Sequence, residues 1–156
     1  AEPWLHRLRH PPLAGHVRHL GYVPAHERER VYAGARLLVQ PSRDEGFGIP
    51  VLEAMSAGIP VIAANRGSLP EVLGDAGPLI DPADAQAFEQ ALHRMVDDSG
   101  YATACAERGL TRAKAYSWSS AAKSVRRAYD YPFARKNGGG RSLAGTEVAR
   151  GDGGSQ

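Results

Sequence analysis

The sequence contains a single cysteine, Cys105, among its 156 residues. One thiol excludes a disulfide framework within the chain and a zinc site built from several cysteines, and it suits a reducing compartment. No apolar run approaches the about 18 residues that a membrane-spanning helix needs, and the first residues are not a basic stretch followed by an apolar one. We therefore expect neither a transmembrane segment nor a signal peptide. We expect a cytoplasmic location, and peripheral attachment to the inner face of the membrane stays open.

An excess of charge of one sign is also lacking. Lys and Arg number 19 against 17 Asp and Glu, which leaves a net charge of +2, and the basic residues are spread along the chain. A nucleic-acid surface would need these residues to cluster, so we expect no nucleic-acid partner. The first residue is Ala and the methionines are Met55 and Met95, so we expect the chain to be a piece of a longer protein.

The length and the hydrophobic content of 42% fit one globular domain with its own core. From about Pro132 onward the character changes, because Gly138–Gly140 and the Gly-rich end at 151–156 offer little apolar surface to bury. We therefore predict an α/β domain over residues 1–131 and a disordered Gly-rich tail over 132–156.

Short apolar runs bounded by Gly, Pro, Ser or Asp alternate with helical patterns. Strands are predicted at 17–23, 37–40, 61–64 and 78–80. Helices are predicted at 25–35, 49–57, 69–73, 84–97 and 101–113, with a last one starting after Ser117 as N-cap. Strands separated by helices pair in parallel through crossovers, so the sequence predicts an α/β fold with helices on both faces of a parallel sheet, like half of a Rossmann-type enzyme.

The most informative stretch runs from Gln40 to Gly58. A strand ends at Gln40, a loop carries Glu45 with two glycines, and a helix starts near Pro50, with Glu53 in its first turns. Open α/β sheets bind ligands at the carboxyl ends of their strands, so both carboxylates are predicted to face one cleft and to accept hydrogen bonds from a sugar diol. The alternative is that Glu53 complements the positive end of its own helix and that Glu45 is a solvated loop residue.

Other polar residues have simpler interpretations. Ser68 and Glu71 have the spacing of a capping box that starts the helix at 69–73. His6 and His10 lie four residues apart, but no carboxylate or thiol nearby completes a metal site, so we expect no metal ion. Cys105 lies on the apolar side of its helix, which favours a small core residue over a nucleophile.

Several ordered motifs support a more specific interpretation. Residues 45–53 read Glu-Gly-Phe-Gly-Ile-Pro-Val-Leu-Glu, in which the two glutamates form an E-x7-E pattern. They are accompanied by Gly-Tyr-Val at 21–23, Val-Tyr at 31–32, Gly-Ile-Pro-Val-Ile at 58–62 and Tyr-Ser-Trp at 116–118. Together, over roughly residues 4–129, these motifs resemble the C-terminal donor-binding domain of retaining glycosyltransferases of family four, which have the GT-B fold.

The resemblance implies roles for individual residues. Glu53 would hold the ribose hydroxyls of a donor nucleotide, and Glu45 would lie beside the transferred sugar as nucleophile, stabiliser or positioning group, of which we favour stabilisation of an oxocarbenium-like centre. The backbone of Gly46, Phe47 and Gly48 would contact the sugar. The amides of Val51 and Leu52 would approach the diphosphate or ribose, and Asn65, at the end of a strand, is a further candidate for ligand contact.

The implied partners are a nucleotide diphosphate sugar as donor and an acceptor glycan, lipid or small molecule bound by an N-terminal domain outside this chain; no cofactor is expected. The chain alone is expected to be inactive. A noncatalytic nucleotide-sugar-binding module, or another GT-B enzyme such as an epimerase or a phosphorylase, remains the alternative. The chain departs from the family in two respects: it lacks the Gly-Arg loop and downstream Lys that contact donor phosphates, and Arg28 replaces the family's usual apolar helix residue.

Overall fold

The computed structural model describes residues 3–137 and divides the chain into two compact units, Ala1–Ala115 and Tyr116–Gln156. The first unit contains a three-stranded parallel sheet in the order β1-β2-β3. Its strands are β1 (Leu38–Gln40), β2 (Val61–Ala64) and β3 (Leu79–Ile80). Leu38 pairs with Val61 and Ala63 pairs with Leu79, so β2 is the central strand. All four residues of β2 are buried, as expected for a strand that is covered on both faces.

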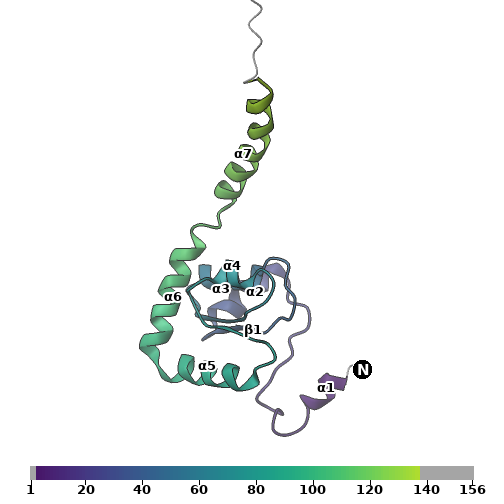
Figure 1. The fold of residues 1–156 in the computed structure, drawn as a ribbon. Coiled ribbons are helices and arrows are strands. Elements are labelled where there is room, and N and C mark those ends of the chain that lie inside the picture. The colour runs from purple at the N-terminus through teal and green to yellow at the C-terminus, as the bar shows by residue number, and fades with distance from the viewer. Residues whose placement is uncertain (1–2, 138–156) are drawn as a thin grey trace, which may run out of the picture. The chain divides into compact units, whose positions relative to one another are not determined.

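Helices cover both faces of this sheet (Figure 1). Alternate residues of a strand point to opposite faces, and in β2 the side chains of Val61 and Ala63 join one core cluster whereas Ile62 joins the other. The first cluster includes residues of the crossover helices α3 (Ile49–Ser56) and α4 (Leu69–Leu73). The second includes Met95 of α5 (Ala85–Asp97) and Cys105 of α6 (Ser99–Ala113). The predicted α/β class, with helices on both faces of a parallel sheet, is therefore confirmed.

Local signals place the helix ends of the first unit. The carboxylate of Asp84 accepts a hydrogen bond from the backbone N–H of Ala87 at 2.9 Å, and Asp98 does the same for Tyr101 at 2.8 Å. These are N-cap bonds of α5 and α6, which satisfy backbone donors that have no partner inside the helix. Cys105 is 1% exposed in the second core cluster, so its prediction as a core residue is confirmed.

The predicted strand at 17–23 does not form. After α1 (Pro3–Arg7) the chain runs through turns and irregular backbone to α2 (Ala25–Ala33), and the side chains of residues 17–22 are exposed. A strand requires a neighbour that accepts and donates its backbone hydrogen bonds, and β1, β2 and β3 pair only with one another. The short run of β-type residues at 17–23 is therefore not sufficient here to make a strand.

The second unit contains α7 (Trp118–Asn137). The hydroxyl of Ser117 accepts a hydrogen bond from the backbone N–H of Ser120 at 3.1 Å, which confirms Ser117 as the predicted cap. The helix continues past Pro132, where the disordered tail was predicted to begin, and ends directly before the glycines at 138–140. The Gly-rich composition on which the prediction rests begins only at Gly138, so it does not oppose a helix over residues 132–137. Residues 138–156 lie outside the described part of the chain, so disorder there stays a prediction.

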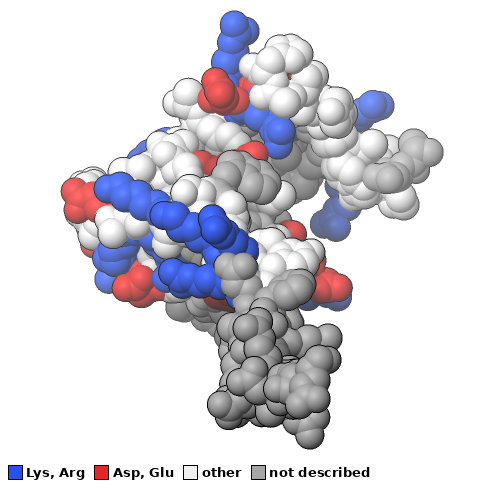
Figure 2. Space-filling view, turned by 90° about the horizontal axis from the view of Figure 1, so that it is seen from above, with Lys and Arg blue, Asp and Glu red and all other residues white. Residues whose placement is uncertain are grey.

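Two further features concern the described residues as a whole. None of the helices within residues 3–137 is long and apolar enough to cross a membrane. Basic and acidic side chains both appear on the face of the molecule in Figure 2, which agrees with the near balance of charges in the sequence.

Candidate functional site

The loop between β1 and α3 carries Glu45, Gly46, Phe47 and Gly48 at the carboxyl end of the sheet. Gly48 stands at the N-cap position of α3 with φ of 85° and ψ of 40°, in the left-handed region that favours glycine. A Cβ at Gly48 would also lie 2.9 Å from a methyl group of Leu69. Pro50 follows in the first turn of α3, where its missing N–H breaks no helical hydrogen bond. Glycine and proline thus place the loop in the position that the sequence predicts.

The half-buried side chain of Glu45 accepts hydrogen bonds from two neighbours, Gln40 of β1 and Gly48 of the same loop. Its Oε2 accepts a hydrogen bond from Nε2 of Gln40 at 3.1 Å, and its Oε1 accepts one from the backbone N–H of Gly48 at 3.3 Å. Glu45 is therefore not simply a solvated loop residue, which was the alternative interpretation of its sequence position. The two donors hold the carboxylate at the end of β1, beside the start of α3.

The backbone of Glu45 is held as well, by the segment that follows β2. Its carbonyl oxygen accepts hydrogen bonds from both the backbone N–H and the hydroxyl of Ser68, each at 3.2 Å. Ser68 makes no side-chain cap bond to α4, so the predicted capping box of Ser68 and Glu71 is wrong. A capping serine accepts a hydrogen bond from a backbone N–H of its helix, whereas the Ser68 hydroxyl is turned to donate its proton to the Glu45 carbonyl.

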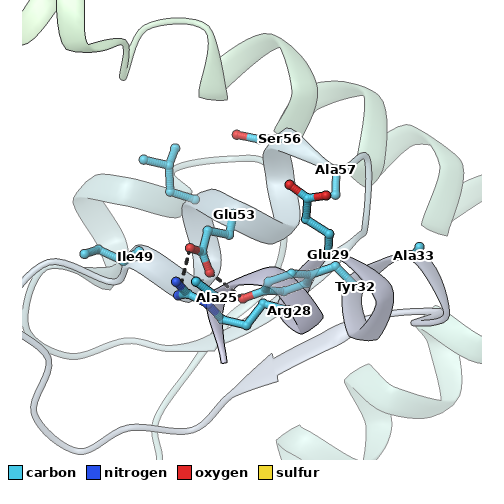
Figure 3. Close-up of a pocket in the computed structure, with 10 residues that line it drawn as sticks. Ala25, Arg28, Glu29, Tyr32, Ala33, Ile49, Glu53, Ser56 and Ala57 are labelled. Carbon is cyan, nitrogen blue, oxygen red and sulfur yellow. Dashed lines mark hydrogen bonds and ion pairs between the residues drawn. The ribbon is translucent and has the colours of Figure 1, made fainter. Parts of the chain in front are cut away.

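Glu53 lies on α3 and makes two contacts with α2. Its Oε1 accepts a hydrogen bond from Nη1 of Arg28 at 3.2 Å, and its Oε2 accepts one from the hydroxyl of Tyr32 at 3.0 Å (Figure 3). The hydroxyl of Tyr32 also lies 3.4 Å from the carbonyl oxygen of Pro50. The side chains of Arg28 and Glu53 are 47% and 35% exposed, so this carboxylate remains accessible to a ligand.

A cavity of about 590 Å³ lies between α2 and α3, within the size range of small-molecule sites. Glu53 lies in its wall together with the charged residues Arg28 and Glu29, as Figure 3 shows. The other residues of the wall are mainly apolar, and several of them are small. They are Ala25, Tyr32, Ala33, Ile49, Leu52, Ser56 and Ala57. Glu45 is not among the lining residues of this cavity, although the sequence predicts one cleft for both glutamates.

The other predicted site residues occupy several environments. Gly46 and Phe47 are exposed in the loop, and Asn65 is exposed directly after β2. Val51 is fully buried in the first core cluster, and Leu52 is partly buried against that cluster. The backbone N–H groups of Val51 and Leu52 both donate to the carbonyl oxygen of Gly48, at 3.0 and 3.2 Å. The side chain of Val51 therefore serves the core, and of these two residues only Leu52 lines the cavity.

Two groups near these residues have shifted pKa values. Burial raises the pKa of Tyr32 to about 12, and its hydrogen bond to Glu53 acts in the same direction, so this hydroxyl stays a donor over the physiological range. The pKa of Asp81, directly after β3, is lowered by the backbone N–H of Ala83 and further by the guanidinium of Arg66. Arg66 and Asp81 form an ion pair of 2.7 Å across the ends of β2 and β3.

Sequence reasoning missed Arg28 and Tyr32 as members of the site. They lie 25 and 21 residues before Glu53, so no helical or strand spacing connects them with it. The available signal was Arg28, a cation where the resemblance implies an apolar helix residue. Among the residues that the structure describes, no group of three or more His, Cys, Asp or Glu is arranged to hold a metal ion.

Comparison with known proteins gives matches by sequence and by structure. The sequence matches the family described as Glycosyl transferases group 1 over residues 6–112. It is 44% identical over 115 residues to an O-antigen chain mannosyltransferase B from Escherichia coli, covering 74% of this chain and 30% of that protein. It is 36% identical over 111 residues to a D-inositol 3-phosphate glycosyltransferase from Corynebacterium urealyticum, covering 70% of this chain and 26% of that protein.

Two solved structures have a similar fold. A sucrose-phosphate synthase from Thermosynechococcus elongatus superposes with a TM-score of 0.75 and 29% identity, over 85% of this chain and 34% of that one. The C-terminal domain of a glycosyl transferase group 1 family protein from Francisella tularensis gives a TM-score of 0.63 and 27% identity, over 72% of this chain and 59% of that one. The chain thus spans less than a third of the length of the two sequence relatives.

Proposed function

The chain belongs to the group 1 family of glycosyl transferases, and we propose that it is the donor-binding part of a retaining enzyme that uses a nucleotide diphosphate sugar. The resemblance to a GT-B glycosyltransferase domain is confirmed by the family match and by the similar folds. The nucleotide donor, the retained configuration, the roles of the two glutamates and the activity of the whole protein are parts of the proposal.

The position of Glu53 is the observation that carries this proposal. Its carboxylate lies in the wall of a cavity of about 590 Å³ and is about one third exposed. A carboxylate accepts hydrogen bonds and donates none, so it suits the vicinal hydroxyls of a ribose. The apolar and small residues around it, among them Ile49 and Ala25, suit the less polar faces of a nucleoside.

Glu45 is proposed to act on the sugar rather than on the nucleotide. In the transfer, the bond between the anomeric carbon and the diphosphate oxygen breaks, and the acceptor hydroxyl oxygen bonds to that carbon as its proton is released. Positive charge develops on the sugar ring as the leaving group departs. A carboxylate that Gln40 and Gly48 already hold in place stabilises this charge without reorganising.

A pair of variants separates the two roles, and it is made in the protein that contains this chain. A hydrogen bond to a charged group contributes roughly 1.5–3 kcal/mol. Glu53→Ala should therefore weaken binding of the free nucleoside diphosphate and of the nucleotide sugar alike, by about ten- to a hundredfold. Glu45→Ala should leave binding of the free nucleotide near wild type and lower turnover of the sugar donor by a larger factor. Calorimetry with UDP, GDP and ADP and steady-state kinetics with the corresponding sugars measure both effects.

The opposite pattern would reverse the assignment of roles, and unchanged binding and turnover in both variants would contradict the E-x7-E interpretation. The products are analysed in the same experiments. Transfer with retention at the anomeric carbon supports the proposal, whereas isomerised donor, phosphorolysis or binding without turnover would contradict it. The acceptor is proposed to be a glycan, a lipid or a small molecule held by a part of the protein outside this chain, because the chain spans less than a third of the length of its two sequence relatives.

A further inference from the structure

The two oxygens of Glu53 each receive one hydrogen bond from α2. Arg28 donates to Oε1 at 3.2 Å and Tyr32 donates to Oε2 at 3.0 Å (Figure 3). A carboxylate has about four lone-pair positions, two on each oxygen. One position therefore remains on each oxygen, and the orientation of the carboxylate plane is set by two donors on a different helix.

This geometry matches what a ribose requires. Its 2′- and 3′-hydroxyls are neighbours, so they bind best to two acceptors that are also neighbours and do not rotate. Without donors from α2, the Glu53 side chain would have to give up rotamer freedom when the ligand binds, and that loss would weaken binding. With both donors in place, the loss has occurred before the ligand arrives.

We propose that Arg28 and Tyr32 are positioning residues that hold Glu53 as a two-oxygen acceptor for the vicinal hydroxyls of a ribonucleotide. This inference rests on the proposed function, because it takes the cavity beside Glu53 as the nucleotide site. It goes further by assigning the preference for ribose over deoxyribose to two residues of α2. In this proposal Arg28, which stands where the resemblance implies an apolar residue, is part of the binding site.

A purely structural role for the two contacts is less consistent with their surroundings. The Arg28–Glu53 pair is substantially exposed, and exposed ion pairs contribute little to folding. None of the residues of α2 is fully buried, and the helix contacts the core through the ring of Tyr32 rather than through Arg28. The ring of Tyr32 packs against the first core cluster, but its hydroxyl is directed at Glu53. Replacing Tyr32 with Phe keeps the ring and removes only the donor.

The test compares ribonucleotides with their 2′-deoxy forms. Binding of UDP, GDP and ADP and of the matching 2′-deoxynucleoside diphosphates is measured by calorimetry on the protein that contains this chain. The wild type should prefer the best-bound ribonucleotide over its deoxy form by about tenfold or more. Arg28→Met and Tyr32→Phe should each weaken binding of the ribonucleotide by about three- to tenfold and change the deoxy form much less. The preference for ribose should therefore narrow in both variants.

Two controls connect the effect to Glu53. Arg30→Met removes the same charge from the same helix at a position outside the cavity, and it should leave the preference unchanged. In a Glu53→Gln background, Arg28→Met should cause no further loss of preference, because the residue that it positions is already altered. Melting temperatures of all variants are recorded, so that a folding defect is seen separately from a change of preference.

The outcomes separate this inference from the function on which it rests. If the wild type binds none of the nucleotides, or if Glu53→Gln leaves binding unchanged, the proposed function fails and this inference fails with it. If Glu53→Gln reduces the ribose preference but Arg28→Met and Tyr32→Phe do not, the positioning role alone is overturned. Equal weakening of ribo and deoxy forms by the α2 variants would also overturn it.

Discussion

Gly67 lies in the segment after β2, close to the backbone of Glu45. Its φ is +55°, and a Cβ built there would lie 2.5 Å from the carbonyl oxygen of Glu45. That oxygen already accepts two hydrogen bonds from Ser68. A side chain at position 67 would therefore have to push apart two backbone segments that hold the catalytic candidate in place.

Gly67→Ala is expected to destabilise the protein and to disturb Glu45. A non-glycine residue in a disfavoured backbone region costs about 1–3 kcal/mol, and the contact with Glu45 adds to this. The matched control is Gly46→Ala in the neighbouring loop, where a Cβ would meet nothing within 4 Å. Urea unfolding compares the two variants, and similar free energies of unfolding would show that the loop can move away from Gly67.

At the scale of the elements, an ion pair joins the ends of two neighbouring strands. Arg66 follows β2 and Asp81 follows β3, and their charged groups are 2.7 Å apart. The backbone N–H of Ala83 donates to the other oxygen of Asp81 at 2.9 Å. The backbone bond and the guanidinium both favour the ionised carboxylate, which lowers the pKa of Asp81 in the folded chain.

The lowered pKa of Asp81 predicts a pH dependence with a definite sign. A carboxylate whose pKa is lower in the folded state contributes its full share to the stability of the fold at pH values above its pKa in the unfolded chain, which is about 3.9. That stability is lost as the pH falls through the folded-state pKa. Asp81→Asn should therefore flatten the acid side of the curve of stability against pH. Urea unfolding between pH 7 and about pH 3 measures the curve, with the exposed Glu107→Gln as control. An unchanged slope in Asp81→Asn would contradict this prediction.

At the scale of the whole chain, the sequence divides into parts with different composition. The helical residues of the second unit end at Asn137, and residues 138–156 are rich in glycine and poor in apolar side chains. Such a composition has little surface to bury in return for the entropy lost on ordering.

Removal of residues 138–156 is therefore expected to leave the melting temperature of the remaining chain within about a degree or two. Circular dichroism on the full and the shortened chain measures this. A shortened chain that melts several degrees lower would mean that these residues pack on the folded part, and the prediction of a disordered tail would be wrong.

The sequence by itself determined the features that depend on neighbouring residues. Apolar runs and helical spacing predicted β1, β2, β3 and the helices between them, because these periodicities follow from the backbone geometry of each element. Gly48 and Pro50 marked the turn and the start of α3 for the same local reason. The E-x7-E pattern selected Glu45 and Glu53 as candidates, and their roles stay predictions.

Only the tertiary structure decided which groups meet across the chain. Residues 17–23 have a strand pattern but no neighbouring strand, and a strand cannot form without a partner for its hydrogen bonds. The hydroxyl of Ser68 bonds to Glu45 rather than to its own helix, and Arg28 meets Glu53 from 25 residues away. The periodicity of the sequence contains no information on such pairs. A polar group forms its hydrogen bond with a partner that the packing of the helices and the sheet brings within about 3 Å.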